Sequence, residues 1–272
     1  MRPAAAFLLA ALLSAASDAG ALELEGDLVQ GGMARGQVAP GTEVRFLERR
    51  VRVSREGRFV IGFGRDFAPT ARLTLIHADG RQEVHELAIA RRDYDVQRID
   101  GLPEKMVTPP PEALARIRRE AELIRAARER DTDAEWYRAG FVWPAVGPIT
   151  GVFGSQRILN GEPRRPHYGV DIAAPRGTPV KAPAAGRVGL AEADLYFTGG
   201  TVLLDHGHGL SSIFLHLDSI GVAAGETVAR GDVIGTLGAT GRVTGPHLDW
   251  RMNWFDQRLD PALVAGPMPP AR

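Results

Sequence analysis

Glycine separates short runs of valine, leucine and isoleucine throughout residues 141–264. Short apolar runs bounded by turn-forming residues are typical of β-strands, and no long helical pattern is needed here. Residues 179–188 and 225–235 also read as two related half-motifs. We therefore predict a mainly β chain whose residues 141–264 form a compact antiparallel β domain that folds back on itself. The punctuating glycines are Gly186, Gly199, Gly200, Gly207, Gly209, Gly225, Gly231, Gly235 and Gly238.

Residues 22–95 carry a second set of strand signals. Asp79-Gly80 is a two-residue hairpin turn, and short strands at this spacing predict an immunoglobulin-like β-sandwich. This module contains no catalytic cluster, and we expect His77 and His85, which flank the hairpin, to face solvent. The strand candidates are 42–47, 51–53, 58–63 and 71–76.

Residues 96–140 have a different character and are predicted to be a helical connector. Proline punctuates positions 109–111, and helical spacing follows over residues 112–130. The surrounding arginine and glutamate residues indicate a solvated face. Residues 265–272 are read as a C-terminal tail. The narrow apolar stripe of the helix consists of Leu114, Ile117, Ala121 and Ile124.

The first 21 residues resemble a secretory signal peptide. Arg2 precedes an apolar stretch at 4–13, and Ala19-Gly20-Ala21 forms a small-residue cleavage site. We expect export to the periplasm or cell envelope and no transmembrane helix after signal removal; an uncleaved membrane anchor is the alternative. The balance of 33 basic and 33 acidic residues gives no indication of nucleic-acid binding. The absence of cysteine excludes disulfides and thiolate metal sites.

Histidine and aspartate recur in three segments of the C-terminal half. His167 precedes Asp171 by four residues, His216 follows an apolar run, and His247 and Asp249 are two residues apart in a strand-like segment. Alternate residues of a strand share one face, so the last two side chains point the same way. Hydrolytic zinc sites use three protein ligands and leave a position for water. The combination predicts a metal-dependent hydrolase.

These segments, in this order and spacing, are similar to the lysostaphin/LytM-type zinc metallopeptidases, peptidase family M23, which cut peptide cross-links of peptidoglycan. The resemblance covers residues from about 141 to 261, a little under half of the chain, and implies a β-sheet groove with zinc at its floor. The matching motifs are Gly151-Val152-Phe153-Gly154, Arg157 with Asn160, His167-x-Gly169-x-Asp171, Gly177-Thr178-Pro179-Val180, Phe214-x-His216-Leu217, Thr240-Gly241 and Gly245-Pro246-His247-Leu248.

The resemblance implies a role for each polar position. His167 and Asp171 would bind zinc, and His216 and His247 would be catalytic. The family's last motif is normally His-x-His, so Asp249 stands where a third ligand histidine is expected. A carboxylate oxygen lies as far beyond Cβ as Nδ1 of histidine does, so Asp249 would reach the metal. Its charge would weaken the pull of the metal on bound water, and manganese is a secondary possibility.

Arg157 and Asn160 would line the substrate groove, or cap a loop. His206 and His208 are expected in an exposed hairpin turn, and Trp250, Trp254 and Phe255 are expected in the core.

The sequence therefore predicts an exported zinc metalloendopeptidase that hydrolyses peptidoglycan cross-links and binds their stem peptides. The alternative is a catalytically weak or inactive LytM-like protein that binds peptidoglycan or activates a cell-wall amidase. The N-terminal module would then position the domain or respond to a cell-wall regulator. A lipoyl- or biotinyl-like carrier is disfavoured, because Lys181 lies in a proline-bounded strand rather than at a hairpin tip.

Overall fold

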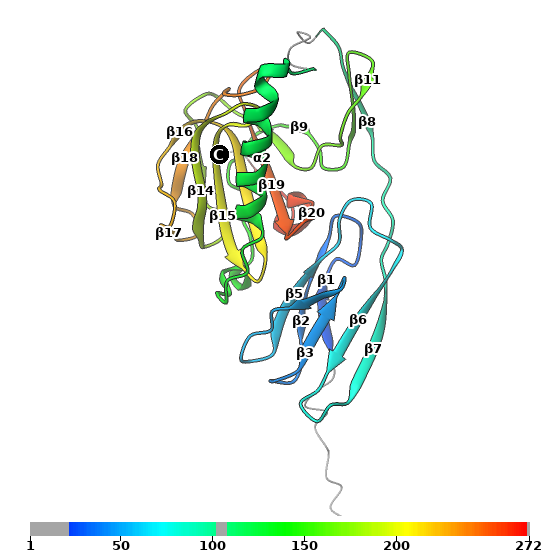
Figure 1. Cartoon of the computed structure of the whole chain (residues 1–272). Helices are drawn as coiled ribbons and strands as arrows, with labels where there is room; N and C mark the ends of the chain where they lie inside the picture. Colours follow the sequence, from blue (N-terminus) through cyan, green and yellow to red (C-terminus); the bar gives the residue numbers. More distant parts are fainter. Residues whose placement is uncertain (1–21, 102–107, 271–272) are drawn as a thin grey trace, which may run out of the picture.

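The structure, a computed structural model, describes residues 22–101 and 108–270. Two β bodies follow one another along the chain, and helix α2 lies across one face of the second (Figure 1). The predicted signal peptide, residues 1–21, lies outside the described residues. Among the helices of the described ranges, none combines the length and apolar character required to cross a membrane.

The N-terminal module consists of two antiparallel sheets around a shared core. Inward-facing residues such as Phe59, Ile61, Leu73 and Leu75 are fully buried. The predicted strands and the hairpin between β6 and β7 are present, while the immunoglobulin-like topology stays a prediction. The strands are β1 (Glu23–Gly26), β2 (Met33–Gln37) and β5 (Arg58–Gly62) in one sheet, and β4 (Arg49–Val51), β3 (Glu43–Phe46), β6 (Thr70–Ile76) and β7 (Gln82–Ala88) in the other.

His77 and His85 do not both face solvent as expected. Their Nε2 atoms lie 3.0 and 3.5 Å from the carboxylate of Glu83, and both side chains are half-buried. The alternation of a strand places His85 and Glu83 on one face of β7, where the two side chains cover each other.

The connector contains a strand as well as the predicted helix. Strand β8 (Val96–Ile99) pairs in parallel with β10 (Gln156–Leu159), which in turn pairs with β11 (Glu162–Pro163). The helical part begins at η1 (Pro111–Ala113), where proline fits the first turn, and continues as α2 (Leu114–Arg128). Helix α2 packs on β14 and β15, with Ile124 and Ala127 against the sheet, whereas Leu114 is exposed. A second short helix, η2 (Trp136–Ala139), leads into the C-terminal domain.

The C-terminal domain is built on one antiparallel sheet, as predicted. Its main path runs β17-β14-β15-β16-β19-β12-β9; β13 and β18 pair with each other, β18 joins β16, and β20 joins β19. One short helix, α3 (Pro261–Ala265), follows the last strand. The strands are β9 (Ile149–Gly151), β12 (Val170–Ala173), β13 (Pro179–Lys181), β14 (Gly186–Leu195), β15 (Gly199–Gly207), β16 (Leu210–Ile220), β17 (Thr227–Val228), β18 (Val233–Leu237), β19 (His247–Trp254) and β20 (Gln257–Leu259).

His206 and His208 are buried, which corrects the expectation of an exposed turn. His206 donates from Nδ1 to the carbonyl of Ala185 at 2.7 Å, and its Nε2 lies 2.8 Å from Oγ of Ser212. Helix η2 covers this end of the hairpin, where the hydroxyl of Tyr137 lies 3.3 Å from Nδ1 of His208. The glycine-rich sequence therefore marks a turn packed under another element.

The two bodies share a continuous core. The Phe46 and Trp254 rings lie 5.8 Å apart, and the guanidinium of Arg49 lies 3.9 Å above the Phe255 ring. A Cβ added to Gly62 would lie 2.7 Å from Cβ of Trp254, so β5 approaches β19 closely. The expected core positions of Trp250, Trp254 and Phe255 are confirmed, and two of these rings also hold the N-terminal module in place.

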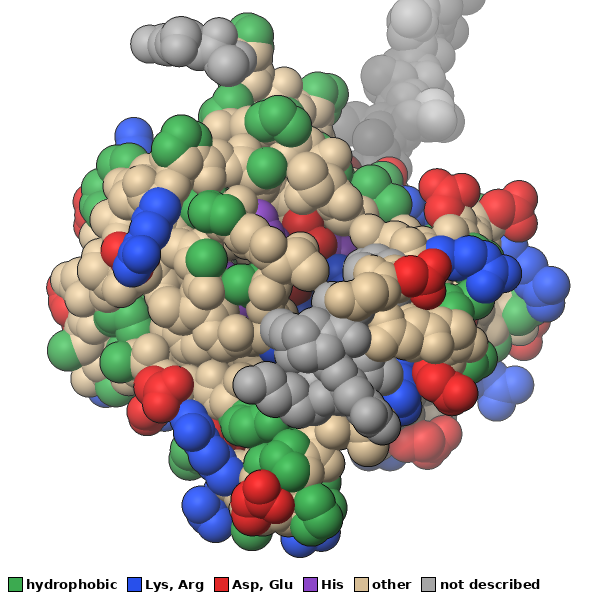
Figure 2. Space-filling view, turned by 90° about the horizontal axis from the view of Figure 1, so that it is seen from above, with side chains coloured by type: hydrophobic (Ala, Val, Ile, Leu, Met, Phe, Trp, Pro, Cys, Tyr) green, Lys and Arg blue, Asp and Glu red, His purple; other side chains and the backbone are tan. Residues whose placement is uncertain are grey.

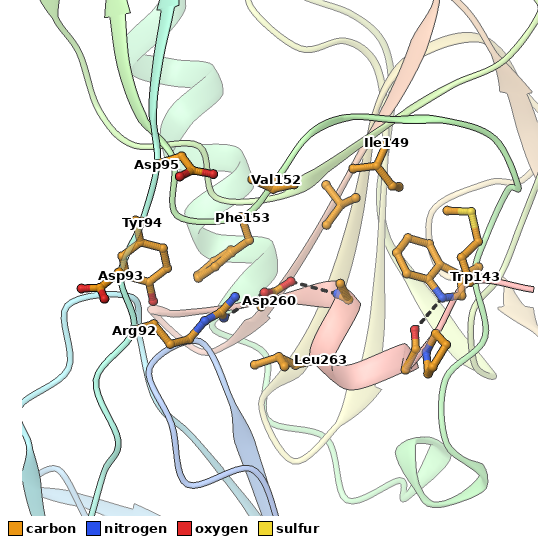
Figure 3. Close-up of a pocket in the computed structure, with 15 residues that line it drawn as sticks. Arg92, Asp93, Tyr94, Asp95, Trp143, Ile149, Val152, Phe153, Asp260 and Leu263 are labelled. Atoms are coloured by element: carbon orange, nitrogen blue, oxygen red, sulfur yellow. Dashed lines mark hydrogen bonds and ion pairs between the residues drawn. The ribbon is translucent and has the colours of Figure 1, made fainter.

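A pocket of about 740 Å³ lies where the last residues of the N-terminal module, Arg92 to Asp95, meet the C-terminal domain (Figure 3). Its walls include Tyr94, Phe153 and Trp143, and the ion pair between half-buried Arg92 and buried Asp260, at 2.9 Å, also lines it. None of the five histidine and aspartate positions singled out above lines it. This pocket is therefore separate from the candidate site.

Candidate metal centre

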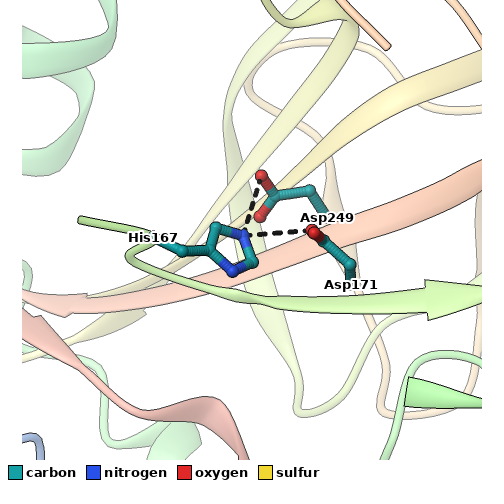
Figure 4. Close-up of side chains that lie close together, drawn as sticks. All are labelled: His167, Asp171 and Asp249. Atoms are coloured by element: carbon teal, nitrogen blue, oxygen red, sulfur yellow. Dashed lines mark ion pairs between the residues drawn. The ribbon is translucent and has the colours of Figure 1, made fainter. Parts of the chain in front are cut away.

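Three of the predicted residues converge in the C-terminal domain. His167 lies in the loop before β12, Asp171 on β12 and Asp249 on β19 (Figure 4). One potential ligand atom from each lies within 4.8 Å of the others, and all three residues are buried. Histidine and carboxylate side chains are also visible deep in the face of the molecule seen in Figure 2.

Strand register brings the two aspartates together. Strands β12 and β19 are antiparallel neighbours, and Asp171 lies directly opposite Asp249. Two like charges at such a position destabilise a sheet unless they are compensated. Nε2 of His167 lies 3.0 Å from Oδ1 of Asp171 and 3.5 Å from Oδ2 of Asp249, between the two carboxylates.

The donor atoms fit a divalent metal ion. Nδ1 of His167 donates to the carbonyl of Val152 at 3.3 Å, so the neutral ring presents the lone pair of Nε2 to the carboxylates. In the described part of the chain, this Nε2 and Oδ1 of Asp171 are buried, lie 3.0 Å from each other and form no hydrogen bond outside the centre. Buried charged groups are costly unless they are paired or coordinate a metal, and imidazole and carboxylate are both accepted zinc ligands.

Two arginines neutralise the carboxylates. Nη2 of Arg157 donates to Oδ2 of Asp171 at 3.1 Å. Arg251 donates to both oxygens of Asp249, from Nε at 2.9 and 3.1 Å and from Nη2 at 2.5 Å. The sequence assigned Arg157 to this region but missed Arg251. The spacing of Arg251 could have revealed it. Arg251 follows Asp249 by two residues on a strand, so the two side chains share one face.

These contacts shift the pKa values of two groups in opposite directions. Burial alone would lower the pKa of His167, but Asp249 and Asp171 raise it above the ordinary value. Burial alone would raise the pKa of Asp249, but Arg251 and His167 hold it well below its ordinary value. Without a metal, the centre is therefore a network of ion pairs.

His216 and His247 lie beside the three candidate ligands. Their ring centroids are 4.9 Å apart, and Nε2 of His247 lies 3.9 Å from Oδ1 of Asp171. Nδ1 of His216 donates to the carbonyl of Thr240 and Nδ1 of His247 to that of Gly245, each at 2.9 Å. With Nδ1 engaged in this way, a neutral ring at either position carries its lone pair on Nε2, where it can act as a base.

A bulge in β16 aims His216. In the pairing with β15, Phe214 faces Val202 but Leu217 faces Gly200, so one extra residue is accommodated, and His216 has a positive φ of 64°. A left-handed histidine in a strand is strained, and such residues cluster at functional sites. Burial lowers the pKa of His216 to about 4. The simple alternation assumed from sequence does not hold here.

Asn160 lies away from the strands that carry the ligands. It occupies the exposed turn between β10 and β11, with a positive φ of 49°. Asparagine tolerates this conformation better than most residues, which agrees with the loop-capping interpretation.

The fold and site together define a β-sheet hydrolase with a buried histidine–aspartate centre. Residues 165–261 match the family described as Peptidase family M23. A solved peptidase M23 from Pseudomonas aeruginosa is 33% identical, with a TM-score of 0.71 over 88% of this chain and 96% of that one. The chain belongs to peptidase family M23, a family of zinc metallopeptidases.

Two curated relatives cover parts of the chain. The cell division protein DipM of Caulobacter vibrioides is 33% identical over 167 residues, which are 58% of this chain and 26% of that protein. The peptidoglycan DD-endopeptidase ShyA of Vibrio cholerae is 41% identical over 131 residues, 48% of this chain and 28% of that protein. The chain thus spans about a quarter of the length of these relatives.

Proposed function

We propose that this chain is an exported zinc metalloendopeptidase that hydrolyses peptide cross-links of peptidoglycan. The observation that carries the proposal is the convergence of His167, Asp171 and Asp249, whose buried ligand atoms lie within 4.8 Å of one another. The relatives named as peptidoglycan DD-endopeptidases support the substrate. Export to the periplasm or cell envelope rests on the predicted signal peptide.

His167, Asp171 and Asp249 would hold the metal. A zinc ion bound there lowers the pKa of a coordinated water and polarises the scissile carbonyl. His216 and His247 would work beside it through their Nε2 atoms. Each ring is fixed by its Nδ1 hydrogen bond, so each Nε2 can accept a proton and return it to the leaving amine.

The low pKa of His216, about 4, keeps this ring neutral at neutral pH. A neutral ring accepts a proton, whereas a protonated ring can only donate one. Retention of both histidines supports an active enzyme over the catalytically weak or inactive alternative.

Metal analysis combined with digestion of purified peptidoglycan tests the proposal. We expect the wild type to contain zinc and to release muropeptides, and Asp249→Ala to lose the metal. His216→Ala should keep the metal and lose activity about 100-fold or more, the range for general acid–base groups. His85→Ala, in the N-terminal module, is the control and should match the wild type. Wild-type protein that neither binds zinc nor releases muropeptides would refute the proposal.

A further inference from the structure

Arg251 binds one of the candidate metal ligands at both of its oxygens. Asp249 and Arg251 are two residues apart on β19, so their side chains share one face of the strand. The guanidinium forms a bidentate pair with the carboxylate, through three contacts of 2.5 to 3.1 Å. Such planar pairs are the strongest charge-assisted hydrogen bonds in proteins.

The two arginines of the centre differ in what they leave accessible. Arg157 takes Oδ2 of Asp171 and leaves Oδ1, which lies 3.0 Å from Nε2 of His167. Arg251 takes both oxygens of Asp249. A divalent cation would therefore find an oxygen of Asp171 that Arg157 does not hold, but it would share both oxygens of Asp249 with a guanidinium.

The backbone around the Asp249–Arg251 pair leaves space for it. A Cβ added to Gly169 would lie 2.4 Å from Oδ1 of Asp249 and 2.6 Å from Cγ of Arg251. Only glycine permits this approach of the preceding loop. The side chain of Asp249 is 3% exposed and that of Arg251 26% exposed, so the pair is largely shielded from solvent.

The positive charges beside the candidate ligands oppose metal binding. The two aspartates carry two negative charges, and Arg157 and Arg251 supply two positive ones before any metal binds, in addition to the proton that His167 can carry. A buried cation beside a ligand repels a divalent ion and competes for the lone pairs that the ion needs. The same cation stabilises Asp249 when the metal is absent.

We propose that Arg251 is a positioning residue that serves as an internal counter-cation of the metal centre. It holds and neutralises Asp249 in the metal-free protein, and it weakens the affinity of the site for a divalent cation. This inference rests on the proposed function, which makes Asp249 a metal ligand.

A purely orienting role makes the opposite prediction. When an outer residue only aims a ligand, its loss typically weakens metal binding by about 10–100-fold. If Arg251 also opposes the metal by charge, its loss tightens binding and destabilises the metal-free protein. The sign of the change in zinc affinity therefore separates the two roles.

The test is a zinc titration of the metal-free full chain against a chelating indicator at fixed neutral pH, with thermal melts of the same samples. We expect Arg251→Gln to bind zinc about tenfold or more tighter and to melt at lower temperature without metal. Arg251→Lys keeps the positive charge but loses the bidentate guanidinium. Its zinc affinity should therefore lie between those of the wild type and Arg251→Gln. Arg258→Gln is the matched control. This arginine lies near Arg251 but contacts Asn253 and the Tyr168 ring, and its loss should change affinity less than about twofold.

Arg251→Gln that is folded and binds zinc as the wild type does, or more weakly, would overturn the inference. If metal-free Arg251→Gln does not fold, Arg251→Lys decides: tighter binding than the wild type supports the inference, and equal or weaker binding overturns it. If neither the wild type nor any variant binds zinc, the proposed function fails, and this inference with it. If Arg251→Gln binds zinc and the wild type does not, the inference is supported, because Arg251 would then block the site.

Discussion

At the scale of single residues, the candidate site is a balance of opposed charges. Asp171 and Asp249 face each other across two strands, and His167 lies between them. In the metal-free protein the two arginines pair with the carboxylates, and the raised pKa of His167 favours its protonated form. A bound metal would replace the proton, so metal binding and proton binding are coupled.

The metal-free protein should lose stability as the pH rises above neutral. The pKa of His167 is raised above 6.5, so its contribution is complete below about pH 6.5 and is lost as the pH rises through the raised pKa. The pKa of Asp249 is lowered below 3.8, so its contribution is present above about pH 4 and is lost as the pH falls through the lowered pKa. Urea unfolding of chelator-treated protein should therefore show a free energy of unfolding that falls with rising pH.

His167→Asn provides the comparison for that experiment. The variant cannot take up the proton, so the alkaline slope should disappear. An unchanged slope in His167→Asn would assign the effect to another group. With excess zinc the wild-type slope should reverse, because zinc needs the neutral ring.

Gly169→Ala should disrupt the centre from the side of the loop. The new Cβ would meet Asp249 and Arg251 at 2.4 and 2.6 Å, distances that force the pair or the loop to move. We expect zinc affinity to fall about tenfold or more and the free energy of unfolding to fall by about 1–3 kcal/mol. Gly245→Ala is the control, because a Cβ there has nothing within 4 Å. Equal effects of the two substitutions would contradict the proposed close packing.

At the scale of secondary-structure elements, the β15–β16 hairpin holds the sheet and one catalytic candidate together. Its far end buries His206 between the carbonyl of Ala185 and the hydroxyl of Ser212. Its other end carries the bulge that aims His216. The hairpin therefore links the rigidity of the core to the geometry of the site.

His206 should make the protein sensitive to acid. Burial lowers its pKa from 6.5 to about 4, so its neutral form stabilises the fold above pH 6.5, and this contribution is lost as the pH falls through about 4. The shift corresponds to about 3 kcal/mol at most. In His206→Gln the free energy of unfolding, measured by urea denaturation, should fall less than in the wild type as the pH drops from 6.5 to about 4.

His216 also has a pKa of about 4, so the acid dependence should shrink in His206→Gln rather than vanish. His85→Gln, in the other module, is the control and should keep the wild-type dependence. An identical acid dependence in wild type and His206→Gln would show that His206 does not contribute.

At the scale of the whole molecule, the N-terminal module and the C-terminal domain are packed as one body. Phe46 and Trp254 join their cores, and Arg58 pairs with Glu135 at 2.7 Å across the junction. Strand β8 adds a second connection, because it pairs with β10, which carries Arg157 next to Asp171. The connector therefore contributes to the surroundings of the site.

Gly62→Val should loosen this packing. A Cβ there would lie 2.7 Å from Cβ of Trp254 and 2.8 Å from Cδ2 of Leu259, so the larger side chain would wedge the two bodies apart. We expect the free energy of unfolding, measured by thermal denaturation, to fall by about 1–3 kcal/mol, and hydrogen exchange in β5 and β19 to become faster. Gly221→Val is the control, because the nearest atom to a Cβ there is 3.7 Å away. Exchange that changes only within the N-terminal module would argue against coupling of the two bodies.

Sequence patterns predicted the parts of the protein that depend on neighbouring residues. Alternation and glycine spacing indicated the strands of both bodies, proline and helical spacing indicated α2, and the order of the motifs indicated the family. Strand periodicity also placed Asp249 on the same face as His247. These features are local, because backbone conformation and face are set within a few residues.

The sequence by itself thus determined a mainly β chain, its family and the five histidine and aspartate positions of the candidate site. The tertiary structure decided the contacts between distant segments. It placed Arg251 on Asp249, buried His206 and His208, formed the bulge at His216 and paired β8 with β10. These outcomes depend on register and packing between segments far apart in the chain. Local periodicity carries no information about which distant charge or carbonyl will meet a given side chain.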